Sequence, residues 1–193
     1  MIKSKSDFKN YLEKDYISLG LKKRKIRIID WIFPDPIWKF QKSLRRLEYY
    51  TNVPSIWNSL LRIVESIRFR RISLKLGFSI PINVFGPGLS IAHYGTIIVN
   101  PNCKVGSFCR LHACVNIGAS SGQTEAPQIG NNVYIGPGAL IFGNIKIADD
   151  ITIGANATVN KSFEEKNCVL AGVPAEVVKK NSDNWVIFNR VQI

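Results

Sequence analysis

From Val99 to Val159 the chain repeats an aliphatic residue at every sixth position, with a single interruption. The aliphatic positions are Val99, Val105, Leu111, Ile117, Ile129, Ile135, Ile141, Ile147, Ile153 and Val159. A second row of small or β-branched residues follows four positions later, at Cys103, Cys109, Val115, Val133, Ala139, Ile145, Ile151 and Ala157. A period of six fits neither the 3.6 of a helix nor the alternation of a hairpin strand. It predicts a repeat architecture, in which each unit is a short strand with a tight corner and neighbouring units stack as a solenoid.

One segment breaks the period. The stretch "GASSGQTEAPQ" (118–128) keeps the spacing between Ile117 and Ile129 but places Gln123 where an aliphatic residue belongs. Burying a glutamine in an apolar interior without partners is costly, so we expect 118–128 to leave the solenoid as a loop. Loops of this kind often carry function.

The first 77 residues follow a helical pattern instead. Ile56, Leu60, Val64 and Ile67 form a stripe at spacings of three to four, which is typical of an amphipathic helix. The proline-containing stretches "IFPDPIW" (32–38) and "TNVPS" (51–55) predict turns, so two or three helices precede Gly77. We therefore divide the chain into a helical region (1–77), a repeat domain (78–163) and a C-terminal tail (164–193).

Charge supports this division. The protein carries a formal net charge of +12; residues 1–77 hold 18 Lys and Arg against 7 Asp and Glu, whereas 78–193 hold 8 against 7. Such a basic region suits an anionic membrane surface or an anionic glycan, and a merely solvated helical surface is the alternative. No recognition motif accompanies the charge, which argues against a nucleic-acid partner. No window resembles a membrane span or a secretory signal, so a cytoplasmic location is expected.

The four cysteines do not form a metal or redox motif. Cys103, Cys109, Cys114 and Cys168 lack CxxC spacing. We expect them to act as small buried apolar residues in a reducing cytosol.

Three further stretches carry a family resemblance. "HYGTIIV" (93–99), "GNIKIADDITIGANATV" (143–159) and "AGVPA" (171–175) follow the helical region in that order. The sequence resembles the hexapeptide-repeat acyltransferases, which implies a left-handed parallel β-helix preceded by helices. It is most similar to the serine O-acetyltransferase family, and within it to members found in capsule and exopolysaccharide gene clusters.

The resemblance implies that His93 is a general base, which takes the proton of an acceptor hydroxyl as that oxygen attacks acetyl-CoA. A neutral imidazole suits this chemistry at cytosolic pH. The alternative is a structural histidine. The eighteen-residue coil places His112 above Ala92 and diagonal to His93, where it either contacts substrate or tunes the base, or else is structural. The zinc carbonic anhydrases of this fold use three histidine positions, and this chain has two histidines, so no metal site is predicted.

The resemblance also implies that acetyl-CoA lies in a groove between neighbouring subunits of a homotrimer or a dimer of trimers. Small residues there would admit its pantetheine arm, and lysines after "AGVPA" would meet its phosphates. The candidate cofactor-binding residues are Gly143, Ala155, Ala157, Ala171, Gly172, Lys179 and Lys180. For the small residues, repeat geometry is the competing explanation. No nucleoside triphosphate or dinucleotide motif is present.

The chain departs from the serine-specific members around the acceptor. It has Ser79 and Ala92 where they have aspartates, and Glu125-Ala126-Pro127-Gln128-Ile129 where they carry an Arg-His pair. A charged ligand binds poorly where its charged partners are missing, so we predict a neutral acceptor. The acceptor we expect is a sugar hydroxyl in capsular or exopolysaccharide biosynthesis. Ser79, His112 and Glu125 are the residues we expect to lie near it. Glu125 is a candidate for orienting His93. The basic helices would hold the enzyme at the inner face of the membrane. The alternatives are L-serine, an amine on an amino sugar, or a non-catalytic scaffold.

Overall fold

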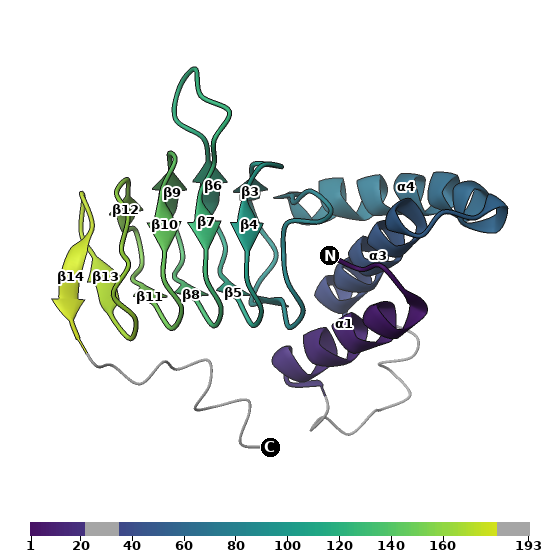
Figure 1. The fold of residues 1–193 in the computed structure, drawn as a ribbon, viewed down its shortest axis with the longest axis horizontal. Coiled ribbons are helices and arrows are strands. Elements are labelled where there is room, and N and C mark those ends of the chain that lie inside the picture. The colour runs from purple at the N-terminus through teal and green to yellow at the C-terminus, as the bar shows by residue number, and fades with distance from the viewer. Residues whose placement is uncertain (22–34, 181–193) are drawn as a thin grey trace.

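The computed structural model describes residues 1–21 and 35–180. Three helices come first in this part of the chain: α1 (Lys5–Ser18), α3 (Pro36–Asn52) and α4 (Ile56–Leu76). A stack of short strands follows them (Figure 1). The predicted turn at 51–55 separates α3 from α4. Residues 32–34 of the turn predicted at 32–38 and the tail beyond residue 180 lie outside the described residues, while Pro36 already begins α3.

Local signals define the helix ends. Ser4, Asp35 and Ser55 are the N-caps of α1, α3 and α4, and each side chain accepts a hydrogen bond from a backbone N–H of the first turn. Pro36 occupies the start of α3, where its missing N–H costs nothing. Gly77 ends α4 in the left-handed region, with φ of 78°. This is the boundary at which the helical pattern ends in the sequence.

Beyond Gly77 the chain winds as a three-sided parallel β-helix. The strands are β1 (Phe78–Ser79), β2 (Ser90–Ile91), β3 (Ile97–Val99), β4 (Lys104–Val105), β5 (Arg110–Leu111), β6 (Asn116–Gly118), β7 (Gln128–Ile129), β8 (Tyr134–Ile135), β9 (Leu140–Phe142), β10 (Lys146–Ile147), β11 (Thr152–Ile153), β12 (Thr158–Val159), β13 (Val169–Ala171) and β14 (Glu176–Lys179). Three sheets result: β1-β3-β6-β9-β12, β4-β7-β10, and β2-β5-β8-β11-β13-β14. The pairing is parallel throughout, except that β14 returns antiparallel on β13.

The six-residue period builds the interior. Every aliphatic residue of the first row is at most 5% exposed, and so is every residue of the second row. Residues of successive coils stack in register: Ile91 lies beside Leu111, Leu111 beside Ile135, and Ile135 beside Ile153. The sequence prediction of a stacked solenoid is therefore confirmed.

The corners of the coils form edges along the β-helix, and two of these matter for function. We call the row 92–96, 112–115, 136–139, 154–157 and 172–175 the histidine edge, because it begins with both histidines. We call the row 100–103, 119–127, 143–145 and 160–162 the loop edge. Residues 119–127 project from it, between β6 and β7 (Figure 1). Ile117 still pairs with Ile141, so the coil resumes in register after the loop.

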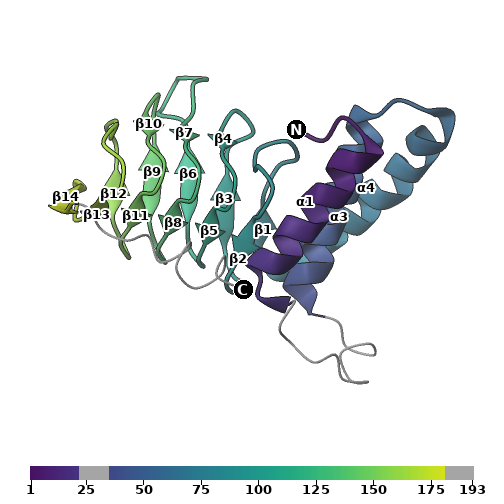
Figure 2. The same cartoon turned by 60° about the horizontal axis from the view of Figure 1, so that its bottom comes forward.

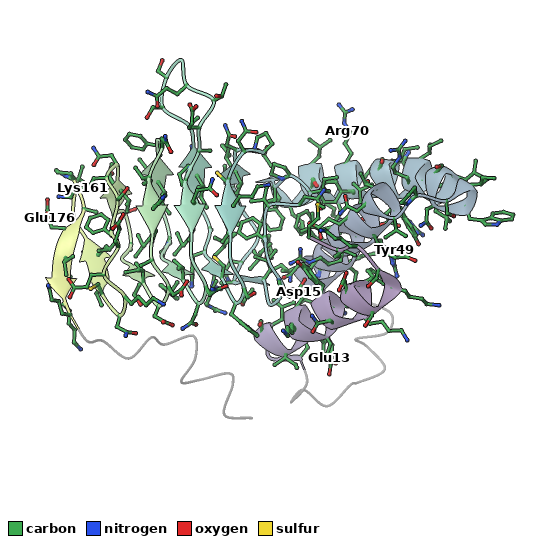
Figure 3. All side chains as sticks on the ribbon, viewed as in Figure 1. Glu13, Asp15, Tyr49, Arg70, Lys161 and Glu176 are labelled. Atoms are coloured by element: carbon green, nitrogen blue, oxygen red, sulfur yellow. The ribbon has the colours of Figure 1, made fainter. Side chains whose placement is uncertain are left out.

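A buried polar network fastens the helices to the first coil. Arg45 on α3 is fully buried, and its guanidinium donates to Asp15 of α1 and to Glu48. It also donates to the carbonyls of Phe85 and Gly86, at 2.9 and 2.7 Å. Asp15 in turn accepts from the backbone N–H groups of residues 88 and 89. Figure 3 labels Asp15 where α1 meets the rest of the molecule, and Figure 2 shows the helices side by side at one end of the β-helix.

The apolar stripe of α4 faces outward. Its members Ile56, Leu60, Val64 and Ile67 are all more than half exposed, whereas the side that meets α3 buries Asn58 and Glu65. An amphipathic pattern normally marks the face that a helix turns to its own domain, so this orientation differs from the usual one. Among the described helices, none combines the length and the apolar character needed to cross a bilayer.

One cysteine also departs from its prediction. Cys103, Cys109 and Cys168 are buried as expected, but Cys114 is exposed. It occupies a corner of the histidine edge with φ of 62°, where its side chain points away from the interior. Burial raises the pKa of the Cys103 thiol to about 11, which keeps that thiol protonated at neutral pH.

Candidate active site

His93 lies at the first corner of the histidine edge. Strand β2 ends at Ile91, and β3 begins at Ile97, so His93 belongs to the bend between these two strands. Its side chain is exposed. The bend is held by the Gly95 N–H, which donates to the Leu76 carbonyl at 3.0 Å. A corner leaves the imidazole accessible from the side of the β-helix.

His112 occupies the next corner, as predicted. The Ala92 N–H donates to the Leu111 carbonyl at 2.8 Å, which brings His112 level with Ala92. The imidazoles of His93 and His112 are 5.9 Å apart between ring centroids, with their planes tilted by 60°. On the following coil the ring of Tyr134 lies 5.1 Å from that of His112. The rings of His93, His112 and Tyr134 thus follow one another from coil to coil, with Tyr134 on β8 next to the edge.

Arg110 joins this group, and the sequence analysis did not identify it. Its Nη1 donates to the Ser90 hydroxyl at 3.0 Å, and its Nε–H donates to Nε2 of His112 at 3.4 Å. In this arrangement Nε2 of His112 is an acceptor, so a neutral ring would carry its proton on Nδ1. Burial lowers the pKa of Arg110, while Tyr134 acts in the opposite direction. Arg110 could have been found from the strand register, because that register places Ser90, Arg110 and Tyr134 next to one another on adjacent strands.

A small cavity of about 110 Å³ opens next to these residues. The helices contribute one wall, and the strands contribute the other; its lining residues are Leu19, Leu21, Asp35, Ile37, Ile91, Ala92 and Arg110. The Asp35 carboxylate already accepts from the N–H groups of Ile37 and Trp38 as a helix cap. The cavity thus has one carboxylate, Asp35, and one guanidinium, Arg110, among otherwise apolar lining residues. The small side chain of Ala92 faces the same space.

The structure does not bring the other two acceptor candidates to His93 within one chain. Ser79 lies on β1 and pairs with Ile98, five residues beyond His93. Glu125 is exposed in the projecting loop of the loop edge, where its carboxylate accepts from the Thr124 hydroxyl at 3.4 Å. A contact between Glu125 and His93 would have to form between two copies of the chain.

Three of the predicted cofactor residues, Ala155, Ala171 and Gly172, lie on or directly beside the histidine edge. Ala155 is exposed three coils beyond His93, which corresponds to about 14 Å at the usual strand spacing. Ala171 and Gly172 lie at the level of the next corner, because the Thr158 N–H donates to the Gly172 carbonyl at 3.0 Å. A Cβ on Gly154 would stand 3.4 Å from the Ala171 side chain. This edge is thus a shallow surface of small residues with the two histidines near one end.

The remaining cofactor candidates are not exposed on this edge: Ala157 belongs to its row but is buried, and the others lie on the loop edge or at the end of β14. Gly143 is buried on the loop edge with φ of 99°, and a Cβ there would meet the Ser120 hydroxyl at 3.1 Å. Ala157 points into the interior of the coil and is fully buried. Lys179 and Lys180 are exposed at the end of β14, where the Lys180 ammonium pairs with Glu165 at 2.6 Å. The interior position of Ala157 and the positive φ of Gly143 each favour a small residue.

Comparison with known proteins relates this chain to acetyltransferases. The family described as bacterial transferase hexapeptide (six repeats) matches residues 126–161. A serine acetyltransferase of Synechococcus elongatus is 30% identical over 98 residues, which cover 50% of this chain and 40% of the relative. A serine acetyltransferase of Staphylococcus epidermidis is 28% identical over 152 residues, covering 72% of this chain and 71% of the relative.

A solved structure extends the likeness to nearly the whole chain. The serine acetyltransferase of Brucella abortus strain S19, in complex with coenzyme A, superposes with a TM-score of 0.70 at 22% identity. The match covers 93% of this chain and 70% of that one. The fold is therefore the left-handed parallel β-helix with preceding helices that the sequence predicted.

Proposed function

We propose that this chain, a serine acetyltransferase-like acyltransferase with hexapeptide repeats, transfers an acetyl group from acetyl-CoA to a hydroxyl, with His93 as the general base. The observation that carries the proposal is the exposed His93 at a corner of the β-helix, beside His112 and at one end of an edge of small residues. The site therefore places a general base, His93, next to a surface of small residues along which the pantetheine arm of acetyl-CoA could lie.

In this mechanism His93 accepts the proton of the acceptor hydroxyl while its oxygen attacks the thioester carbon. The carbon–oxygen bond forms, the carbon–sulfur bond breaks, and the imidazolium returns the proton to the departing thiolate. A positioned base of this kind typically contributes about 10²–10⁴ in rate. His112 would position the acceptor or His93, because Arg110 fixes its tautomer.

Acetyl-CoA would run along the histidine edge, past Ala155 toward Gly172. The name of the Brucella structure, a complex with coenzyme A, supports this choice of co-substrate. We propose that Lys179 meets the nucleotide phosphates, since Lys180 is already paired with Glu165. Gly143 would contribute from the loop edge of a second copy.

This site therefore requires an oligomer, which we propose to be a homotrimer or a dimer of trimers. Glu125 and Gly143 stand on one edge, and His93 stands on another, so a groove that uses both edges forms only between adjacent chains. Ile98 and Leu140 are exposed on the sheet between these edges. Their contact with a second copy would remove apolar surface from water.

The comparisons favour L-serine as the acceptor over the sugar hydroxyl predicted from the sequence, because both named relatives are serine acetyltransferases. Arg110 also favours serine, since a guanidinium beside the Ala92 cavity suits an α-carboxylate. Ala92 and Glu125 support the sugar, because neither would stabilise a zwitterion in the way the family's charged groups do. A sugar hydroxyl in a surface polysaccharide remains our second candidate.

The test is to measure thiol release from acetyl-CoA with L-serine and with a panel of sugars, in the wild type and in His93→Ala. We expect acceptor-dependent release that falls by about 10²–10⁴ in the variant. Cys114→Ser, exposed on the same edge, is the matched control and should retain activity. Acceptor-dependent release that survives in His93→Ala would refute the base, and release with neither acceptor class would favour the non-catalytic scaffold.

A further inference from the structure

We propose that α4 and the cleft between α3 and α4 form a docking surface for an anionic lipid bilayer. Two observations support this proposal independently: an exposed apolar helix face and a cluster of cations beside it. The proposal concerns where the protein sits, and it does not rest on the acetyl-transfer reaction.

The first observation is the outer face of α4, which we define as Ile56, Trp57, Leu60, Ile63, Val64 and Ile67. Ile56 is 82% exposed, Trp57 75% and Ile63 60%. At 3.6 residues per turn these positions fall on one side of the first three turns. An exposed contiguous apolar face of this kind marks an interaction site.

The orientation of α4 is fixed by polar contacts on its inner side, so the exposure is not a rotation that the helix can easily reverse. The Glu65 carboxylate accepts from the Ser43 hydroxyl of α3 at 2.5 Å. The Asn58 amide donates to the Val53 carbonyl at 2.7 Å. Rotating α4 so that its apolar face points inward would break both hydrogen bonds. Figure 3 labels Arg70, which points away from the body of the molecule on the same helix.

The second observation is the α3–α4 cleft, a cavity of about 190 Å³ lined by Lys39, Lys42, Ser43, Arg46, Glu65, Arg68 and Ile72. Four cations face a single carboxylate there. Burial lowers the pKa of Lys42, and the neighbouring Arg46 and Lys39 lower it further. Repulsion among these groups would be relieved by an anion in the cleft, and a phosphate headgroup has the charge that fits.

The two features adjoin. Arg68 lines the cleft, while Leu61 and Val64 occupy the preceding turns on the side that leads from the cleft to the outer face. Apolar side chains with a tryptophan among them thus lie next to cations, a combination that suits the headgroup region of an anionic membrane. The apolar side chains would enter the acyl region, and the cleft would hold headgroups.

Charge argues for lipid over a second copy of this chain. Along its 21 residues α4 carries Arg62, Arg68, Arg70, Arg71 and Lys75 against one acid, Glu65, on the inner side. A symmetric pair of such helices would bring like charges together, whereas an anionic bilayer offers the opposite charge. We therefore commit to the bilayer as the occupant.

Sedimentation of the full chain with phosphatidylserine-containing vesicles tests the proposal, with pure phosphatidylcholine vesicles for comparison. We expect binding to the anionic vesicles that weakens as salt is raised. The variant Leu60→Gln/Val64→Gln/Ile67→Gln changes the outer face, and Lys42→Gln/Arg46→Gln changes the cleft. Each should lower the partition coefficient at least tenfold, because one side chain of either kind contributes roughly fivefold.

The matched control is Lys104→Gln/Lys146→Gln, which removes the same charge from the β-helix and should bind like the wild type. Light scattering in solution and circular dichroism check the assembly and fold of each variant. Absent wild-type binding, or equal binding by the outer-face variant, refutes the proposal. If the outer-face variant instead changes the mass of the oligomer, the face is an interface between copies, and the proposal is also wrong.

Discussion

Replacing Arg45 with methionine is expected to weaken the attachment of the helices to the β-helix. Methionine fills much of the same volume but removes every hydrogen bond of the guanidinium. The lost partners are the carboxylates of Asp15 and Glu48 and two carbonyls of the first coil. Burial disfavours the charge of Arg45, but the two carboxylates outweigh that effect and raise its pKa. The cation is therefore held in place by its partners.

The magnitude follows from what remains behind. Asp15 is fully buried and Glu48 is 1% exposed, so the variant leaves two carboxylates without their counter-ion. Removing one partner of a buried ion pair costs about 3–5 kcal/mol. For 193 residues the unfolding entropy is roughly 0.4 kcal/mol per kelvin, so the melting temperature should fall by about 10 °C.

Thermal unfolding followed by circular dichroism measures this change. Arg70→Met, on the exposed side of α4, is the matched control and should melt within about 1 °C of the wild type because surface changes are usually small. The double variant Arg45→Met/Glu48→Gln should regain part of the loss, because it removes one of the unpaired charges. A fall of less than about 3 °C in Arg45→Met would show that the buried network contributes much less to the free energy of unfolding than this argument requires.

Three further predictions concern the corners. Gly138→Ala should destabilise the protein by about 2 kcal/mol or more in urea unfolding, because φ is +72° and the new Cβ would clash with the Asn156 side-chain oxygen; wild-type stability would contradict this. Cys114 should react with a thiol reagent in the folded protein while the three buried cysteines react only after unfolding, and rapid labelling of all four would be the opposite result. The pKa of Asp149 is lowered, chiefly by the Asn131 backbone N–H, so its stabilisation is present above pH ~4 and lost as pH falls through the folded pKa. Asp149→Asn should therefore show a shallower acid unfolding curve than the wild type, and identical curves would refute this assignment.

The repeat domain could be predicted from the sequence because its interior is narrow. Each coil has room for one aliphatic residue at each position, so the six-residue period of Ile117, Ile135 and Ile153 is a direct record of contacts. The glutamine at 123 was equally informative, since it cannot enter that interior. Here local pattern and tertiary contact coincide.

The helical region was less predictable. The pattern of Ile56 to Ile67 specifies which side of α4 is apolar, but not what that side meets. Its inner side is held by Asn58, Glu65 and the α3 residues that pair with them, and no sequence period announces such contacts. The same holds for Arg110, whose role depends on Ser90 and His112 from neighbouring positions in space.

The two ends of the strand stack have a consequence for self-association. An unpaired terminal coil would offer a template for cross-β growth, because its backbone groups point along the stacking direction. At the first coil, Gln41 and Arg45 donate to the carbonyls of Leu89, Phe85 and Gly86, so that end is already occupied. At the other end β14 reverses direction on β13, and a further parallel coil cannot continue from it in register. Both features disfavour end-to-end growth of the described β-helix into fibrils, although β14 covers only the sheet that ends at β13.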